Sequence, residues 1–279
     1  MKIGSLCIFA GLLLATTVGL ARAQQQTTIE KISQIAASSS CAATDWKNRG
    51  RAPKAYMRGL AIVFARAVCQ PNRNDVKIVS AAQGEPNSNA KKTDALTWYD
   101  GVFSDLGMSN ATAGVETLRH VYTLLAGLGM RESSGQHCVG RDRSANFTTA
   151  DSAEAGLFQT SHGAHRFDIE LSNLYASYKA DQGNCLLDVF KRGVSCSAWD
   201  ARTWGEGEGA TWQQLTKACP AFATEYAAVL IRIHGGNEGE FGPIRRRKAE
   251  VIASCDTMFS EVQNLVQANP NACSELQLP

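Results

Sequence analysis

The stretch LAGLGMRESSGQHCVG, residues 125–140, decides how this chain is interpreted, because it places a glutamate at the end of an apolar helical run. Leu118, Val121, Leu125 and Leu128 step by three, four and three residues and trace one helix face. Glu132 comes four residues later, so we expect its carboxyl group to continue this buried face. Burial without a cationic partner raises the pKa of a carboxyl group. The spacing therefore predicts a proton donor, with a loop cap or a pair with a nearby arginine as the alternative.

Helical spacing of apolar residues dominates the rest of the chain, and alternating strand patterns are nearly absent. The best strand candidate is DVKIVSA, residues 75–81, and it is short. A polar stretch at residues 82–93 is the longest expected surface loop. We therefore predict a mainly α fold with at most a small β element. Further helical stripes are expected at residues 29–36, 56–64, 96–106, 209–235 and 244–268.

The first 23 residues have the pattern of a secretory signal peptide. Lys2 precedes an apolar run that is shorter than the roughly 20 residues of a membrane span, and Ala21-Arg22-Ala23 has the form of a cleavage site. We expect a secreted or periplasmic protein with no stable membrane span, and an uncleaved N-terminal anchor is the alternative. Residues 24–110 are interpreted as an N-terminal helical extension and residues 111–279 as the main domain.

Removal of the signal changes both the charge and the cysteine count. Without Lys2 and Arg22 the formal charge of +2 falls to 0, which argues against a nucleic-acid partner. Without Cys7 the nine cysteines become eight, and an oxidising compartment predicts up to four disulfides of undetermined pairing. No Cys-x-x-Cys pair occurs in the sequence. We therefore expect no metal site, and no cofactor is indicated.

A second motif, AGLFQTS at residues 155–161, follows RESSG at residues 131–135. Together, in this order and spacing, the two motifs resemble the lysozyme superfamily, in particular goose-type lysozymes and bacterial lytic transglycosylases (SLT-like domains). The resemblance covers mainly residues 118–161. It implies a lysozyme-like helical domain that cleaves peptidoglycan at the β-1,4 bond between N-acetylmuramic acid and N-acetylglucosamine.

The resemblance also implies a role for each motif residue. Glu132 would be the general acid and Ser133 would hydrogen-bond near the acid or the substrate. The remaining residues would bind the sugar: Gly156 and Leu157 at the floor of the cleft, Phe158 in place of the family's Met, Gln159 along the wall, and Ser161 at a position that some goose-type enzymes fill with an aspartate.

The sequence offers three candidates for a second carboxylate, because Asp142, Asp151 and Glu154 all follow Glu132. Asp151 lies nearest the position of the water-activating aspartate of goose-type enzymes, so it is the catalytic candidate, with a loop or helix cap as its alternative. A water-positioning carboxylate would give hydrolysis with inversion. Without one, Glu132 would act as acid and then as base, and the C6 hydroxyl of the substrate would close a 1,6-anhydro ring.

The sequence is also compatible with two further function classes. A related glycoside hydrolase could act on chitin-type polymers, and a non-catalytic relative could bind glycan or protein. The dense basic run Arg245 to Lys248 is expected to be a solvated face, with contact to the acidic stem peptides of a cell-wall polymer as the alternative.

Overall fold

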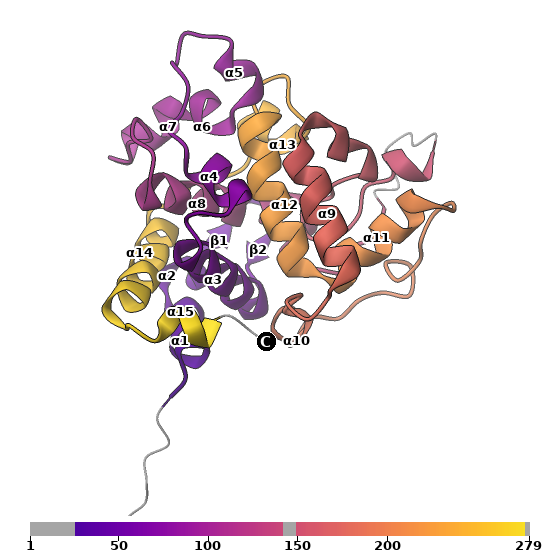
Figure 1. Ribbon diagram of the computed structural model, residues 1–279, viewed down its shortest axis with the longest axis horizontal. Helices are drawn as coiled ribbons and strands as arrows, with labels where there is room; N and C mark the ends of the chain where they lie inside the picture. The colour runs from indigo at the N-terminus through magenta and orange to yellow at the C-terminus, as the bar shows by residue number, and fades with distance from the viewer. Residues whose placement is uncertain (1–25, 142–148, 277–279) are drawn as a thin grey trace, which may run out of the picture.

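Helices make up most of residues 26–141 and 149–276, which are the residues that the computed structural model describes (Figure 1). The first half of the chain also contributes a two-residue antiparallel strand pair, in which Asp45 is opposite Arg51. The α-helices, two short 3-10 helices (η) and strands are α1 (Thr28–Ser38), α2 (Ser40–Ala43), β1 (Asp45–Trp46), β2 (Gly50–Arg51), α3 (Lys54–Cys69), α4 (Asn74–Ser80), α5 (Ala90–Thr93), α6 (Ala95–Trp98), α7 (Asp100–Asp105), α8 (Val115–Ser133), η1 (Ala150–Ser152), η2 (His162–Phe167), α9 (Ile169–Ala180), α10 (Leu187–Phe190), α11 (Glu208–Ala218), α12 (Pro220–Ile233), α13 (Gly242–Arg245), α14 (Ala253–Ala268) and α15 (Ala272–Leu276).

The helices begin where the local sequence allows it. Thr27 caps α1 with its side chain, and Glu30 reaches back to the Thr27 amide in a reciprocal capping box. Pro220, which interrupts the predicted helical stretch 209–235, is the first residue of α12. A proline is tolerated there because the first amides of a helix have no partner within the helix. That stretch is therefore two helices, α11 and α12.

The two ends of the described chain lie side by side (Figure 1). Helix α1 packs against α3, α14 and α15, while α12 runs through the centre between α3 and α9. The disulfides Cys41–Cys255 and Cys69–Cys273 join the first part of the chain to the last. Buried residues from α1 to α15 form one continuous hydrophobic cluster. Helices before and after residue 110 thus share a core, although the predicted boundary at that residue stays a prediction.

The mainly α fold with a small β element is confirmed, and so is its stabilisation by disulfides. Two local predictions were wrong. Residues 75–81 fall largely within helix α4, where Val76 and Val79 are buried three residues apart on a helical face. A short apolar run does not distinguish helix from strand by spacing alone, and packing on α8 and α12 decides in favour of the helix.

The predicted helix over residues 244–268 is also interrupted. Helix α13 ends at Arg245, and α14 begins only at Ala253. Between them Arg247 has a left-handed backbone with φ 49°, and its guanidinium lies 3.8 Å from the ring centroid of Trp98. This contact and the close approach of the Glu250 backbone to α8 hold the segment out of the helical conformation. Residues 82–93 are largely a loop, as expected, and end in the short helix α5.

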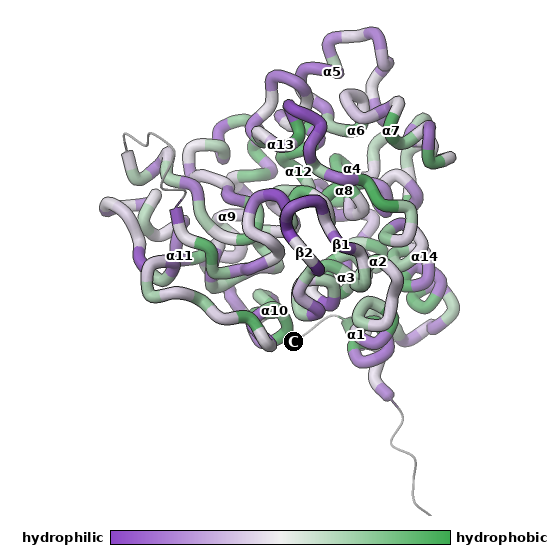
Figure 2. Tube along the Cα trace, turned by 180° about the vertical axis from the view of Figure 1, so that it is seen from behind, coloured by the Kyte–Doolittle hydropathy of each residue, from purple (hydrophilic) through white to green (hydrophobic). Residues whose placement is uncertain are grey.

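None of the described helices is both long and apolar enough to cross a membrane. The predicted signal peptide, residues 1–23, lies outside the described residues. Figure 2 shows the face opposite that of Figure 1, with the β1–β2 hairpin in front of α3.

Candidate functional site

Helix α8 carries the predicted acid on its last turn. Leu118, Val121, Leu125 and Leu128 are buried, which confirms the predicted apolar face. The helix continues through Ser133, but Glu132 is only partly buried. Its carboxyl group leaves the core-facing stripe at the end of the helix and reaches a pocket at the surface.

Two glycines in α8 let neighbouring segments approach the helix closely. A Cβ atom at Gly129 would lie 2.3 Å from the Tyr56 hydroxyl oxygen, and one at Gly127 would lie 2.0 Å from the Glu250 carbonyl oxygen. The Tyr56 hydroxyl donates to the carbonyl of Leu125 at 2.9 Å. The glycines therefore belong to the packing of α8 against α3 and the segment before α14, and they do not end the helix.

The second motif is a tight turn. Ala155 and Thr160 form an isolated antiparallel bridge, and between them Gly156 takes a left-handed conformation with φ 79°. Gln159 is also left-handed, and its side-chain amide donates to the Gly156 carbonyl at 2.9 Å and to the Val139 carbonyl at 3.4 Å. These bonds fix both the turn and the direction of the Gln159 side chain.

Ser133 connects the two motifs. Its hydroxyl donates to the Gly129 carbonyl at 3.1 Å within α8 and to the Leu157 carbonyl at 2.7 Å in the turn. Both Ser133 and Leu157 are buried. The serine beside the acid therefore holds the second motif against the end of the helix.

Glu132 and the second motif meet in a pocket of about 480 Å³. Five separated parts of the chain supply its walls: the β1–β2 hairpin, the end of α8 with the loop after it, residues 154–159, residues 199–200 and residues 243–248. Its lining residues are Arg49, Arg131, Glu132, Val139, Gly140, Arg141, Glu154, Gln159, Trp199, Asp200, Pro243, Arg246 and Lys248.

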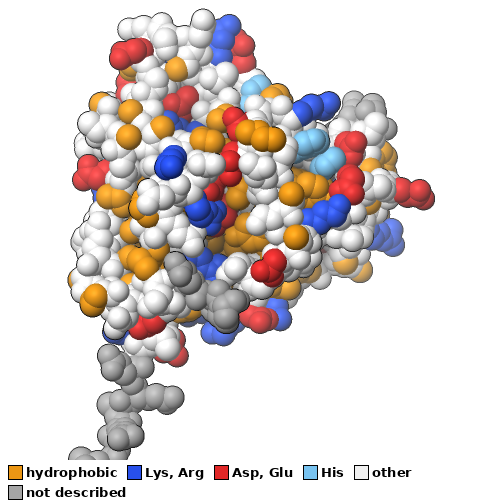
Figure 3. Space-filling view, in the orientation of Figure 1, with side chains coloured by type: hydrophobic (Ala, Val, Ile, Leu, Met, Phe, Trp, Pro, Cys, Tyr) orange, Lys and Arg blue, Asp and Glu red, His pale blue; other side chains and the backbone are white. Residues whose placement is uncertain are grey.

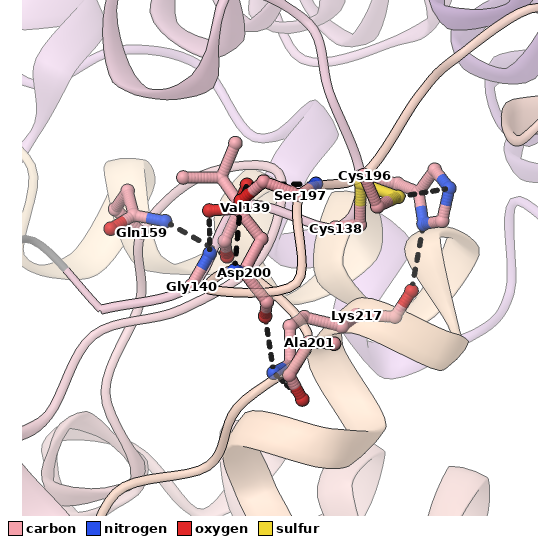
Figure 4. Close-up of a disulfide and its surroundings, with 10 residues drawn as sticks. Cys138, Val139, Gly140, Gln159, Cys196, Ser197, Asp200, Ala201 and Lys217 are labelled. Atoms are coloured by element: carbon pink, nitrogen blue, oxygen red, sulfur yellow. Dashed lines mark hydrogen bonds between the residues drawn. A yellow bond between two sulfur atoms is a disulfide. The ribbon is translucent and has the colours of Figure 1, made fainter.

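A disulfide fixes one wall of this pocket (Figure 4). Cys138–Cys196 joins the loop after α8 to the loop that carries Asp200. One Asp200 carboxylate oxygen accepts the Gly140 amide at 3.1 Å, while the other accepts the Ser197 hydroxyl at 2.5 Å. Burial acts to raise the pKa of Asp200, but these hydrogen bonds and the charge of Lys217 outweigh it and hold that pKa below its usual range.

Lys217 also holds this wall of the pocket, through hydrogen bonds to backbone carbonyls. Lys217 is a buried residue, and its ammonium group donates to the carbonyls of Asp200 at 2.9 Å and Arg202 at 2.8 Å. This burial lowers the pKa of Lys217. The loop that carries Trp199 and Asp200 is thus held by a covalent bond, a carboxylate and a buried ammonium group.

The predicted site residues occupy different places relative to this pocket. Glu132 and Gln159 line it, whereas Leu157 and Phe158 are buried beneath the turn. Gly156 approaches Thr216 of α11, because a Cβ atom at Gly156 would lie 2.9 Å from the Thr216 Cβ. Ser161 is buried, precedes η2 and is not among the residues lining the pocket. Of the predicted sugar-binding residues, Gln159 is thus the one that lines the pocket.

The candidate second carboxylates are separated by the fold. The Asp151 side chain is 60% exposed, pairs with His162 at 3.0 Å and is not among the residues lining the pocket. Glu154 does line it. Asp142 lies outside the described residues. The geometry therefore favours Glu154 over Asp151 as the carboxylate that shares the pocket with Glu132, while the catalytic role of Asp151 stays a prediction.

Several lining residues were missed from the sequence. Arg49 belongs to the predicted N-terminal extension, and no local motif signals that its hairpin reaches the end of α8. Trp199, which is 41% exposed, and Asp200 lie in a stretch without periodicity. Their only sequence signal is the nearby Cys196, whose partner could not be chosen in advance.

The cysteines of the described residues form four disulfides, and the fourth joins Cys185 to Cys219. His137 lies near Cys138 and Cys196, but the sulfur atoms of those cysteines are bonded to each other and are not thiolate ligands. The His137 ring instead contacts the Lys217 carbonyl at 2.9 Å, and burial lowers its pKa.

No protein-family model, curated protein or solved structure matches this chain.

Proposed function

We propose that this chain is an exported peptidoglycan-cleaving enzyme, either a lytic transglycosylase or a muramidase, with a lysozyme-like domain and Glu132 as its general acid. The observation that carries the proposal is the meeting of two separate motifs: Glu132 at the end of α8 and Gln159 in the AGLFQTS turn line one pocket. Four disulfides in the described chain fit an oxidising compartment outside the cytoplasm.

The first chemical step is proton transfer. Glu132 gives its proton to the glycosidic oxygen that leaves C1 of N-acetylmuramic acid, and positive charge develops at that sugar. Glu132 is then a carboxylate beside the reacting carbon. Trp199 lines the same pocket and is 41% exposed, and the Arg202 guanidinium lies 5.1 Å from its ring centroid, so a sugar ring would contact the part of the indole that stays exposed.

The second step has two forms. In hydrolysis, Glu154 positions and deprotonates a water molecule that attacks C1. In transglycosylation, the C6 hydroxyl of the same sugar attacks C1 and gives its proton to Glu132, which closes a 1,6-anhydro ring and regenerates the acid. Because Glu154 lines the pocket and Asp151 does not, Glu154 is the better candidate for the hydrolytic route.

Digestion of purified cell-wall sacculi by matched variants tests this proposal. Glu132→Gln keeps the size of the side chain and removes the proton donor, so we expect a loss of about 100- to 10,000-fold in cleavage rate. Glu116→Gln is the control, because Glu116 is an exposed glutamate in the first turn of the same helix. A Glu132→Gln protein that keeps its fold and its cleavage rate would refute the assigned acid.

The second carboxylate is tested in the same assay. If Glu154 positions and deprotonates the attacking water, Glu154→Gln should abolish hydrolysis. If the enzyme is a transglycosylase, the same substitution should leave the formation of anhydro products largely intact. Asp151→Asn provides the comparison at the residue that the sequence favoured. If Asp151→Asn loses activity and Glu154→Gln does not, Asp151 and not Glu154 would be the carboxylate that activates the water.

A further inference from the structure

The Cys138–Cys196 disulfide differs from the others of the described residues in its access to solvent. Cys196 is an exposed residue, although its partner Cys138 is buried. The other three disulfides have no exposed cysteine: Cys41–Cys255, Cys69–Cys273 and Cys185–Cys219. Cleavage of a disulfide begins with the attack of an outside thiolate on one of its sulfur atoms, so access limits the reaction. Cys138–Cys196 is therefore the disulfide that we expect a dithiol in solution to reduce first.

The imidazole ring of His137 lies beside this disulfide. Its Nε2 atom is 4.0 Å from the Cys196 Sγ atom, and its Nδ1 atom is 2.9 Å from the Lys217 carbonyl oxygen (Figure 4). A carbonyl oxygen only accepts hydrogen bonds, so Nδ1 carries the proton and Nε2 is the unprotonated nitrogen of the neutral ring. Histidines that bind metal ions are typically oriented in this way, with the second nitrogen held by a backbone carbonyl or a carboxylate.

Three potential metal ligands thus meet at one place. In the described residues, His137, Cys138 and Cys196 form the one group of three such side chains whose ligand atoms lie within 4.8 Å of one another. Histidine and acidic side chains are also neighbours on the face shown in Figure 3, but they form no such group among the described residues. Tetrahedral zinc geometry needs about 3.6 Å between nitrogen and sulfur ligands and about 3.8 Å between two sulfurs. The three atoms can reach these separations by small side-chain movements once the sulfurs are no longer bonded.

A pocket of about 330 Å³ adjoins the three side chains, which all line it. Its other walls include Leu187 of α10, Lys217 of α11 and Asp200. The Asp200 carboxylate already accepts from the Gly140 amide and the Ser197 hydroxyl, and the Lys217 ammonium group donates to backbone carbonyls. The pocket therefore leaves room for a water molecule as the fourth ligand of a metal ion bound by the three side chains.

We propose that reduction of this disulfide by a dithiol creates a Zn²⁺ site formed by His137 Nε2 and the Cys138 and Cys196 thiolates. The dithiol supplies two electrons and two protons: the S–S bond breaks, each sulfur becomes a thiol, and the dithiol closes to its own disulfide. Zn²⁺ then displaces one proton from each thiol to solvent. The two thiolates offset the charge of the ion. The oxidised protein lacks this site, because its sulfurs are bonded to each other.

The ligand set determines the class of metal ion. Thiolate and imidazole ligands suit Zn²⁺, whereas Mg²⁺ and Ca²⁺ prefer oxygen ligands. A bound Zn²⁺ would also take over the mechanical role of the disulfide, because it would again join the loop after α8 to the loop that carries Asp200. Asp200 lines both this pocket and the Glu132 pocket. The site therefore provides a second way to hold that wall under reducing conditions, and it does not depend on the proposed activity.

Metal binding is measured on the full chain before and after limited reduction. Dithiothreitol is the reductant and is removed without oxygen, and differential alkylation with peptide mass spectrometry identifies the cysteines that were opened. Competition with a coloured chelator gives the Zn²⁺ affinity. Co²⁺ serves as a second probe, because thiolate ligands give it a sulfur-to-metal charge-transfer absorption. We expect one equivalent of either ion to bind to the reduced protein and none to bind to the oxidised protein.

Matched variants locate the ligands. His137→Asn keeps an N–H donor for the Lys217 carbonyl and removes the ligand nitrogen, so Zn²⁺ affinity should fall by more than the roughly 10- to 100-fold that loss of an outer-shell partner costs. His234→Asn is its control, because His234 stacks on Phe167 and does not line this pocket. The double variant Cys138→Ser with Cys196→Ser, treated with the same reductant, should bind neither ion and reports any metal held elsewhere.

Thermal unfolding gives an independent readout. Free Zn²⁺ at about 100 times its Kd should raise the Tm of the reduced protein by about 5–11 °C and leave that of the oxidised protein unchanged. Four results would overturn the inference: no binding by the reduced protein, equal binding by the double serine variant, unchanged affinity in His137→Asn, or opening of all four disulfides together. None of these measurements involves glycan cleavage, so their outcome is separate from that of the Glu132→Gln digestion.

Discussion

The hydroxyl of Ser133 is expected to hold the two motifs of the site together, and Ser133→Ala tests this directly. The substitution removes the donor at 2.7 Å from the buried Leu157 carbonyl. Within the described residues that carbonyl has no other hydrogen bond, whereas the Gly129 carbonyl keeps the Gly135 amide at 3.1 Å. One buried acceptor is thus left without a partner, which costs about 1–3 kcal/mol of the free energy of unfolding.

Urea unfolding and calorimetry measure this cost. For a chain of this size, each kcal/mol corresponds to about 2–4 °C in Tm, so we expect Tm to fall by about 2–12 °C. Ser38→Ala is the matched control, because Ser38 is also the last residue of its helix and its exposed hydroxyl donates to the Gln34 carbonyl at 2.8 Å. If the two variants differed by less than about 0.5 kcal/mol, the proposed connection would be refuted.

Two further predictions concern the framework of the pocket. Gly129→Ala places a Cβ atom 2.3 Å from the Tyr56 hydroxyl and should lower the free energy of unfolding by about 1–3 kcal/mol in urea titration, whereas Gly101→Ala, which meets no atom within 4 Å, should not. Replacement of both Cys138 and Cys196 by serine opens a loop with a sequence separation of 58 residues, for which loop-closure entropy predicts a loss of about 4 kcal/mol. A Tm unchanged by the double serine variant would contradict the second prediction.

The sequence was sufficient to predict the helix that carries Glu132, because long periodic stretches define a buried face. The pair of motifs also predicted that Glu132 and Gln159 belong to the same cleft. The sequence did not predict that Glu132 lies only partly buried at the pocket. The spacing of Leu128 and Glu132 describes a face of the helix, but the depth of a side chain at the last turn depends on the loops packed around that turn.

Long-range contacts set the limit of the sequence-based prediction. Arg49 lies in the β1–β2 hairpin and lines the pocket, and no periodic pattern in the sequence indicates this hairpin. Arg246 and Lys248 do so because α13 ends early, and the following segment is held by the contact of Arg247 with Trp98. Such contacts join residues far apart in the chain, so local spacing does not contain them.

The proposed role of Glu132 is tested most directly by the mass of the fragments released from peptidoglycan by the unmodified protein and by Glu132→Gln. We expect fragments that end in N-acetylmuramic acid, either with a reducing end or in the 1,6-anhydro form that lacks one water, and we expect Glu132→Gln to release almost none. Fragments that end in N-acetylglucosamine, cuts confined to peptide bonds, or equal release by the two proteins would contradict it.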